Sequence, residues 1–379
     1  MKLIHISDLH LGKRLGEFSL LEDQKYILNE ILSLVDEEIP DGVMIAGDVY
    51  DKSVPSAEAV SLFDDFLVCL AAQAPRVFVI SGNHDSPERI AFGARLMDRS
   101  GVHLSPVYDG TLSPITLTDA HGPVHIYMLP FVKPAHVRRY FPESPVDSYN
   151  DAMRLALIDC PAEPDARNIL ITHQFVTGAS RCDSEEISVG GTDNVDVSLF
   201  SAFDYVALGH LHNPQQVYRE TVRYCGSPLK YSFSEANVQK SVSVITLGAK
   251  GETSIHTVPL RPLREMRELR GTYEEITRRS YYYGTTYQDD YLHITLTDEE
   301  DIPDVLGKLR SIYRNIMKLD YDNRRTRFRA DVIGAQNVEE KTPLALFGEF
   351  YQLQNNQPLT ATQLHYVADL INEIWEGEV

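Results

Sequence analysis

Short apolar runs alternate with longer amphipathic segments in the N-terminal part of the chain. Residues 41–49 are a nearly continuous apolar run, as expected for a strand covered on both faces, and residues 2–8 and 76–83 also read as strands. The segments between them, residues 20–39 and 56–72, carry apolar side chains at helical spacing, and Ser56 is a suitable N-cap for the second. The chain therefore begins with the strand and helix alternation of an α/β fold.

A third helix is expected over residues 86–101. Ser86 stands at its N-cap, Pro87 at its first helical position and Gly101 at its end. Strand-like runs then follow with less helix between them, at residues 125–131, 168–174, 205–210 and 241–248. The α/β start is therefore expected to continue as a β-rich region.

The pattern changes near residue 265, where charged residues become frequent. Residues 291–297 alternate as a strand and residues 304–316 read as a helix, which predicts a small second α+β domain. The chain ends in an amphipathic segment whose apolar side chains share one helix face: Leu364, Val367, Ile371, Ile374 and Trp375. That face either packs on the chain's own second domain or docks a partner, and the sequence favours neither.

The composition is that of an ordinary globular protein. The 379 residues suggest two or three domains, and 43% hydrophobic with 24% charged residues is typical of soluble chains. The N-terminal residues are too polar for a signal peptide, and no apolar run approaches the roughly 18 residues of a membrane span. The 4 cysteines lack CxxC spacing, which indicates reduced thiols, so a cytoplasmic location is expected.

The formal net charge of -20 bears on the binding of nucleic acid. It argues against a protein that coats nucleic acid by charge alone, because such binding depends on Lys and Arg neutralising phosphates. It is compatible with an enzyme whose local cationic site is made by metals. One basic cluster stands out around Phe328: Arg324, Arg325, Arg327 and Arg329. This cluster is either a solvated face or a strand face that touches DNA or an acidic partner.

Histidine, aspartate or asparagine residues follow five separate strands of the expected fold. They are Asp8, His10, Asp48, Asn83, His173, His210 and His212. In open α/β folds, ligands bind beyond the carboxyl ends of the strands. Any one of these residues could be an N-cap, a turn residue or a core histidine. That explanation becomes improbable when it has to cover every strand end at once.

These side chains are all of metal-ligand types. Imidazole, carboxylate and amide oxygen together suit borderline divalent ions such as Mn, Fe or Zn, and not a thiolate site. The set is too large for one ion. It fits two ions that share one carboxylate, at the separation of about 3.5–4 Å found in two-metal hydrolytic sites.

The ordered motifs D-x-H, G-D, G-N-H-D, H and G-H-x-H resemble those of the calcineurin-like metallophosphoesterase superfamily. Within it, GDVYDKSVPS, HQFVTG, the VGG at residues 189–191 and YCGSPLKYSFSEANVQKSV resemble the bacterial Mre11-type nucleases, the SbcD subunits of SbcCD exonucleases. The resemblance has clear landmarks from residue 1 to about 265 and is weaker beyond. It implies a two-sheet β-sandwich flanked by helices, with a small α+β capping domain and C-terminal helices.

The resemblance also implies how the metals are held. It assigns three residues to each ion and one to both: Asp8, His10 and His212 to the first, Asn83, His173 and His210 to the second, and Asp48 to both. Two Mn²⁺ ions are expected, with Mg²⁺ or another divalent ion as alternatives.

His84 follows a metal ligand but is not expected to bind metal itself. The resemblance implies that it contacts the scissile phosphate or protonates the leaving oxygen, a task that suits an imidazole near neutral pH. Asp85 is expected to orient His84 or to cap the helix that begins near Pro87. Asp51 stands where archaeal and eukaryotic relatives often have a histidine, and no catalytic role is assigned to it.

The resemblance implies a DNA nuclease subunit with Mn-dependent exonuclease and endonuclease activity at double-strand ends and hairpins, serving DNA replication, repair and recombination. The implied partner is a coiled-coil ATPase of the SbcC (Rad50-like) kind, bound to a homodimer of the nuclease within a heterotetramer. Residues 1–265 would form the nuclease domain, 266–335 the capping domain and 336–379 the helical segment that docks the ATPase. The ATPase would also supply DNA-binding surface that this acidic chain lacks.

Other functions of the same fold are the alternatives. The same metal set serves small-molecule phosphodiesterases and pyrophosphatases, although a compact enzyme of that kind would not need the trailing domain. Protein phosphatases usually read G-D-x-x-D-R-G and G-N-H-E, where this chain has GDVYDKS and GNHDS. A non-catalytic scaffold would have lost metal ligands, and every ligand type is in place here.

Overall fold

The computed structural model of the chain describes residues 1–158, 160–185, 194–324, 326, 344–345, 347–348, 351–352 and 358–376. The chain divides into two compact units, Met1–Glu265 and Met266–Val379. Several sequence features discussed above lie outside the described residues: the VGG at residues 189–191, Arg325, Arg327, Phe328 and Arg329.

The first unit contains two sheets, and the first of them is a 6-stranded sheet of order β14–β13–β1–β4–β5–β6. Its strands are β1 (Lys2–Ile6), β4 (Gly42–Ala46), β5 (Val77–Ile80), β6 (Val102–Leu104), β13 (Ser241–Leu247) and β14 (Thr253–Pro259). The strands β1, β4, β5 and β6 are parallel, whereas β13 and β14 pair antiparallel. Every residue of β4 and β5 is buried, which accounts for their continuous apolar runs.

The second sheet is also 6-stranded, with the order β11–β12–β10–β9–β8–β7. Its strands are β7 (Ile115–Asp119), β8 (Gly122–Leu129), β9 (Arg167–His173), β10 (Tyr205–Gly209), β11 (Gln215–Val217) and β12 (Arg219–Tyr224). The central strands β8, β9, β10 and β12 are parallel, and the edge strands β7 and β11 pair antiparallel.

The two sheets pack face to face around one apolar core. Leu3, Met44 and Phe78 of the first sheet lie in the same buried cluster as Ile126 and Ile169 of the second. Full burial of such a side chain contributes about 1.5–3 kcal/mol to folding. The expected two-sheet sandwich is therefore confirmed, and the strands that carry the predicted ligands are shared between two sheets.

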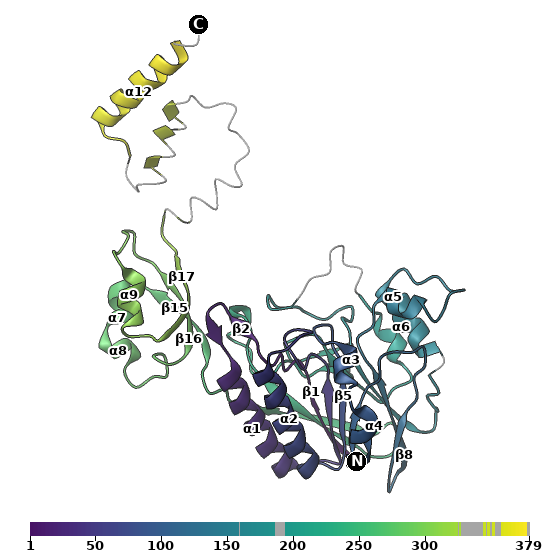
Figure 1. Ribbon diagram of the computed structural model, residues 1–379. Coiled ribbons are helices and arrows are strands. Elements are labelled where there is room, and N and C mark those ends of the chain that lie inside the picture. The colour runs from purple at the N-terminus through teal and green to yellow at the C-terminus, as the bar shows by residue number, and fades with distance from the viewer. Residues whose placement is uncertain are drawn as a thin grey trace. The chain divides into compact units, whose positions relative to one another are not determined.

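Helices accompany both sheets of the sandwich (Figure 1). The longer ones are α1 (Leu21–Glu38), α2 (Ala57–Gln73) and α6 (Tyr149–Ile158), with the shorter α5 (Pro134–Arg138) beside α6. The predicted cap of α2 is present, because the Ser56 side chain accepts a hydrogen bond from the Ala59 N–H. Met153 of α6 packs with Leu170 and Val206 of the second sheet in a second buried cluster. The smaller elements of the unit are β2 (Arg14–Leu15), β3 (Phe18–Ser19), η2 (Val197–Phe200) and η3 (Phe233–Glu235).

The helix expected over residues 86–101 is broken into three short pieces. These are α3 (Pro87–Ile90), α4 (Ala94–Met97) and the 3-10 turn η1 (Asp98–Ser100). The Ser86 cap is present, since its side chain accepts a hydrogen bond from the Arg89 N–H. Gly93, however, has a φ of +74°, which a continuing right-handed helix does not contain. The prediction of one continuous helix is therefore wrong.

The second unit is built on a 3-stranded parallel sheet of order β15–β16–β17. Its elements are β15 (Met266–Gly271), α7 (Tyr273–Thr277), α8 (Arg279–Tyr282), β16 (Tyr291–Leu296), α9 (Val305–Arg310) and β17 (Asn315–Tyr321). Leu292 and Ile294 of the central strand form its core with Leu309 of α9. The predicted strand at residues 291–297 is present, and the predicted helix at residues 304–316 is shorter than expected.

The last described element is α12 (Ala361–Glu376). On its predicted apolar face, Leu364 is 47% exposed and Val367 and Ile371 are half-buried, so this face is partly open to solvent. The side chains of Ile374 and Trp375 lie outside the described residues. None of the helices in the described parts of the chain is long and apolar enough to cross a membrane.

Candidate metal centre

Side chains from both sheets meet at the carboxyl ends of the parallel strands. Four overlapping groups have potential ligand atoms within 4.8 Å of one another: Asp8, His10 and His212; His10, Asp48 and His84; Asp8, Asp48 and His173; and Cys182, His212 and Glu235. Asn83 and His210 join them through contacts with each other and with His173. The structure thus brings together all the side chains for which a metal role is predicted.

The first group lies between β1 and the loop that follows β10. The Nε2 atoms of His10 and His212 are 3.1 Å apart. The Asp8 carboxylate accepts hydrogen bonds from the Ser7 hydroxyl and, at 3.0 Å, from the His210 N–H. Asp8, His10 and His212 are all at most 2% exposed, so their donor atoms face one another inside the protein.

The second group lies between β5, β9 and β10. The Asn83 Oδ1 atom is 2.9 Å from His173 Nε2 and 3.0 Å from His210 Nδ1. On the other side of its ring, His173 Nδ1 is 2.8 Å from the Ala46 carbonyl oxygen. A carbonyl only accepts, so Nδ1 of His173 carries the proton and Nε2 presents a lone pair in the neutral ring.

Asp48 lies between the two groups. Its Oδ2 atom is 3.5 Å from His10 Nε2 of the first group and 3.3 Å from His173 Nε2 of the second. Its Oδ1 atom accepts a hydrogen bond of 2.9 Å from the His84 N–H. This is the position that a carboxylate shared by two ions requires.

The donor set fits divalent cations. In the second group the Asn83 Oδ1 and Asp48 Oδ2 atoms lie 2.9 and 3.3 Å from His173 Nε2, so two oxygen atoms favour positive charge at this point, carried by a proton on the ring or by a cation. The charges favour this. Burial by itself lowers the pKa of His173, yet Asp48 raises it to about 9, so the cavity attracts a cation. Burial also raises the pKa of Asp48, but His173, His10 and His84 hold it well below its ordinary value.

The backbone at the candidate ligands is unusual. Non-glycine residues with positive φ in the described chain include four of the predicted ligands: Asp8 (φ 54°), His10 (φ 44°), Asp48 (φ 49°) and His210 (φ 105°). Such conformations cost of order 1–3 kcal/mol each and tend to gather at functional sites. The sharp turns they make direct the side chains back over the ends of the strands.

Glycines in the ligand motifs allow the two sheets to approach at this end. A Cβ on Gly209, the first residue of GHLH, would collide with the Ala46 carbonyl of β4 and would lie 2.6 Å from His173 Nδ1. A Cβ on Gly82, the first residue of GNHD, would collide with the Asp48 carboxylate. The glycines are therefore explained by close packing around the ligands.

His84 lies at the rim of the centre. Its Nδ1 atom is 3.0 Å from the backbone carbonyl of Asp51, to which it donates. Its Nε2 atom is 4.0 Å from Asp48 Oδ2, and the side chain is 19% exposed. The carbonyl fixes the ring so that Nε2 is on the side of the Asp48 carboxylate.

Asp85 does not have either of the expected roles. Its buried carboxylate accepts hydrogen bonds from the backbone N–H groups of Val49, Tyr50 and Gly82. Ser86 is the N-cap of α3, and the hydrogen bond from His84 Nδ1 goes to the backbone carbonyl of Asp51. Asp85 thus holds the turns that follow β4 and β5, and the prediction that it orients His84 or caps the helix is wrong.

Sequence reasoning missed Lys13 and Tyr231. The Lys13 Nζ atom is 2.8 Å from the Asp51 carboxylate, and the Tyr231 ring packs edge-on against His10 and His212. The Tyr231 hydroxyl donates to the Leu9 carbonyl at 2.6 Å. Tyr231 lies in the GSPLKYSFSE segment, so its place in that motif was the available signal.

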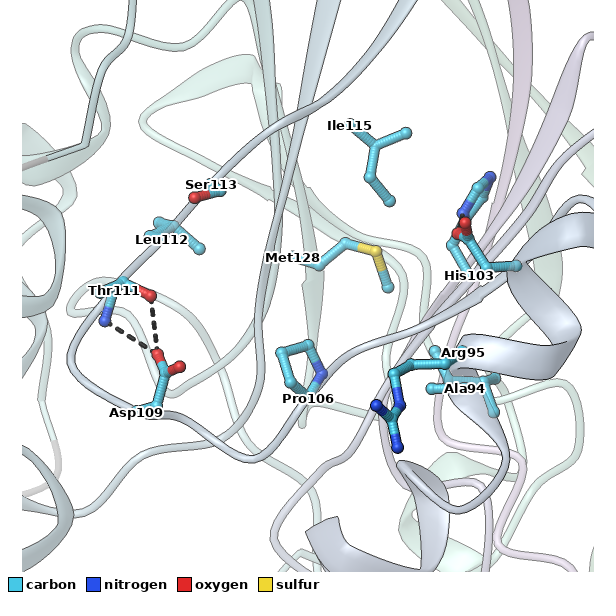
Figure 2. A pocket seen from close by; sticks show the side chains of 12 residues that line it. Ala94, Arg95, His103, Pro106, Asp109, Thr111, Leu112, Ser113, Ile115 and Met128 are labelled. Carbon is cyan, nitrogen blue, oxygen red and sulfur yellow. Dashed lines mark hydrogen bonds and ion pairs between the residues drawn. The ribbon is translucent and has the colours of Figure 1, made fainter.

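A pocket of about 550 Å³ lies elsewhere in the first unit (Figure 2). It is lined by residues of α4, β6, β7 and β8 and of the loop between β6 and β7, where Asp109 accepts hydrogen bonds from the Thr111 backbone and hydroxyl. None of the predicted ligands lines it. It is therefore separate from the metal centre.

Comparisons with known proteins agree with the motifs. The family model described as calcineurin-like phosphoesterase matches residues 1–214, and the one described as type 5 capsule protein repressor C-terminal domain matches residues 262–355. The D subunit of the nuclease SbcCD from Staphylococcus epidermidis is 32% identical over 385 residues, which cover 100% of both chains. Among solved structures, TT1561 of Thermus thermophilus is 13% identical, with 68% of this chain and 98% of that chain aligned at a TM-score of 0.37.

Proposed function

The chain belongs to the calcineurin-like phosphoesterase family and, within it, to the SbcD nuclease subunits, and from this premise we propose that it cleaves DNA with two divalent metal ions. The resemblance drawn from the ordered motifs is confirmed, and membership of the family makes the chain a phosphoester hydrolase. The observation that carries the proposal is the position of Asp48 between two groups of buried donor atoms.

The proposed metal ligands follow the two groups. Asp8, His10 and His212 would hold one ion, Asn83, His173 and His210 the other, and Asp48 both. When bound there, divalent cations neutralise charge on a phosphate and make a water molecule more acidic. The mixed nitrogen and oxygen donors support Mn²⁺ as the working ion, and other divalent ions share this preference in part.

The chain's own residues supply the remaining parts of the reaction. His84 contacts the scissile phosphate or gives a proton from Nε2 to the leaving oxygen, because its Nδ1–H is held by the Asp51 carbonyl. Lys13, paired with Asp51, adds a positive charge close to His10 and His84. Tyr231 and the buried walls hold both rings of the first group in place.

The DNA substrate and the ATPase partner are proposed from the relative, whose name makes it a subunit of the SbcCD nuclease. The net charge of -20 supports the need for a partner, because the chain has little capacity to bind DNA phosphates by itself. We assign duplex ends and hairpins as substrates, with the nuclease acting as a homodimer within a heterotetramer. The cytoplasm is the proposed location, which the free cysteines at all 4 positions support.

The domain roles are part of the same proposal. Residues 1–265 would carry the chemistry and residues 266–335 would form the capping domain. Residues 336–379 would dock the SbcC-type (Rad50-like) ATPase. The apolar side chains of α12 support this, since Leu364 and Leu370 are 47% and 39% exposed.

The decisive experiment is cleavage of an end-labelled linear duplex and a DNA hairpin, with Mn²⁺ titrated from zero. The wild type, His84→Ala and the control His256→Ala would be compared, each with and without the candidate ATPase and ATP. His256 is a suitable control because its side chain is 55% exposed and its ion-pair partner, Glu38, is not a predicted ligand.

The expected result is Mn-dependent cutting that His84→Ala abolishes, that His256→Ala retains and that the ATPase increases. Turnover of a small phosphodiester with no cutting of DNA under any condition would instead assign the chain to the small-molecule phosphodiesterases or pyrophosphatases. No turnover of either substrate would point to a scaffold.

A further inference from the structure

A buried ion pair lies directly behind the metal centre. The Glu235 Oε2 atom is 2.5 Å from Lys240 Nζ, and the two residues are 0% and 3% exposed. Both belong to the YCGSPLKYSFSEANVQKSV segment, and neither has a part in the proposed chemistry. The pair therefore needs an explanation of its own.

The pair reaches the His212 ring through one hydroxyl. Ser184 Oγ donates to Glu235 Oε1 at 2.6 Å and lies 2.7 Å from His212 Nδ1. The Ser184 hydroxyl has one proton, and it donates that proton to Glu235. Its oxygen therefore accepts a hydrogen bond from the Nδ1–H of His212. The relay fixes the tautomer in which His212 Nε2 carries the lone pair.

The His212 backbone is held by the same residues and one neighbour. Lys240 Nζ donates to the His212 carbonyl at 2.7 Å, and the His212 N–H donates to Glu185 Oε1 at 2.7 Å. Every polar group of His212 except Nε2 is thus bonded to this network. Nε2 itself faces His10 Nε2 at 3.1 Å, inside the first group of donor atoms.

Stability alone does not account for such an arrangement. A buried ion pair costs the desolvation of two charges, and apolar side chains of similar volume often replace it without loss of stability. The Lys240 ammonium lies 2.5 Å from the Glu235 carboxylate, so the two opposite charges are held against each other. A charged, fully bonded carboxylate behind a ligand histidine is the arrangement that orients metal ligands in proteins.

We propose that Glu235, Lys240 and Ser184 are positioning residues that hold His212 with Nε2 directed at the metal ion of the Asp8, His10 and His212 group. This inference rests on the proposed metal site and does not depend on the identity of the substrate. It gives the SFSE part of the segment a role: it sets the metal affinity of one of the two sites.

The test is a Mn²⁺ titration of the metal-free full-length chain by calorimetry, with free Mn²⁺ followed by electron paramagnetic resonance. The variants are Glu235→Gln, Ser184→Ala and Ser184→Thr. The matched control is Glu265→Gln, which alters the Lys230–Glu265 pair of 2.6 Å, another ion pair made by a residue of the same segment.

Glu235→Gln and Ser184→Ala are expected to weaken one of two Mn²⁺ sites by about 10- to 100-fold and to leave the other unchanged. Ser184→Thr should restore the affinity because it keeps the hydroxyl, and the control should bind like the wild type. Wild-type affinity at both sites in a folded Glu235→Gln protein would overturn the proposal, as would equal weakening of both sites.

A variant that fails to fold does not block the test. The double change Glu235→Met with Lys240→Met removes both charges together, which protects folding, but it still removes the relay to His212. Its loss of one Mn²⁺ site is expected, and retention of both sites would overturn the proposal. Because Mn²⁺ binding is measured without DNA, failure of the nuclease assignment would leave these outcomes unaffected.

Discussion

The Nε2 atom of His173 lies 2.9 Å from the Oδ1 atom of Asn83, while the Nδ1 atom on the other side of the ring is bonded to the Ala46 carbonyl. The Asp48 Oδ2 atom lies 3.3 Å from the same Nε2 atom, so three potential ligand atoms meet at this point. This relationship links the fold to its chemistry, because β4, β5 and β9 meet there only when the two sheets are packed together.

Removal of this ring should abolish one metal site. At a Mn²⁺ concentration about 100-fold above the dissociation constant, each occupied site stabilises the folded chain by about 2.7 kcal/mol. His173→Ala is expected to lose the stabilisation that an ion in the second group provides and to keep the stabilisation from an ion in the first group. Thermal unfolding with and without Mn²⁺ measures this, with His256→Ala as the control. An unchanged Mn²⁺-induced shift of the unfolding temperature in His173→Ala would contradict the assignment.

Gly209→Ala should destabilise the same region by steric overlap alone. The added Cβ would collide with the Ala46 carbonyl, so β10 and β4 would have to move apart. Overpacking of this kind costs about 1–3 kcal/mol or more. Urea unfolding would measure the loss, with Gly348→Ala as the control, because a Cβ there comes no closer than 3.9 Å to Leu359. Equal stability of both variants would show that the strands tolerate the wider spacing.

His84 and Asp51 are expected to respond differently to substitution. A proton-transferring imidazole contributes about 10²- to 10⁴-fold to the rate, so His84→Gln should reduce DNA cleavage by that factor. Asp51 holds His84 through its backbone carbonyl, which Asp51→Asn keeps. We therefore expect Asp51→Asn to retain most of the activity. Comparable losses in the two variants, measured as kcat/KM on a labelled duplex, would give the Asp51 side chain a part in the reaction.

The clustering of the candidate ligands could be predicted from the sequence because each one follows a strand. The apolar runs before Asp48 and His210 are visible without a structure, and parallel strands place their carboxyl ends together. Periodicity does not encode which strands share a sheet, so the meeting of two sheets at the ligands depends on the family resemblance. Gly93 was visible as well, but a glycine within a helical pattern only sometimes breaks the helix.

The network behind His212 could not be predicted from local pattern. Ser184 and Glu235 are 51 positions apart in sequence and are brought together only by the fold. Neither residue follows a predicted strand as the candidate ligands do, and a serine or glutamate in a loop normally contacts solvent. The role of Asp85 could not be predicted either, because its three backbone partners follow two different strands.

His5 should make the folded chain sensitive to acid. It is buried between the sheets, and its Nδ1 atom is 2.9 Å from the Tyr205 hydroxyl of the opposite sheet. Burial lowers its pKa from 6.5 to about 3. Below about pH 6.5 the unfolded chain therefore takes up a proton that the folded chain refuses, and stability falls as the pH decreases toward the folded-state pKa.

The variant His5→Gln removes this proton uptake and keeps a polar partner for Tyr205. From about pH 7 to about pH 5, the wild type should lose on the order of 2 kcal/mol more unfolding free energy than His5→Gln, by the linkage of one pKa unit to 1.36 kcal/mol. Urea unfolding of both proteins with a chelator at each pH measures the difference, and the other titrating groups cancel because they are common to both. His256→Gln, which changes a largely exposed ring, should follow the wild type. If the gap between wild type and His5→Gln is the same at both pH values, His5 is not held neutral in the folded chain.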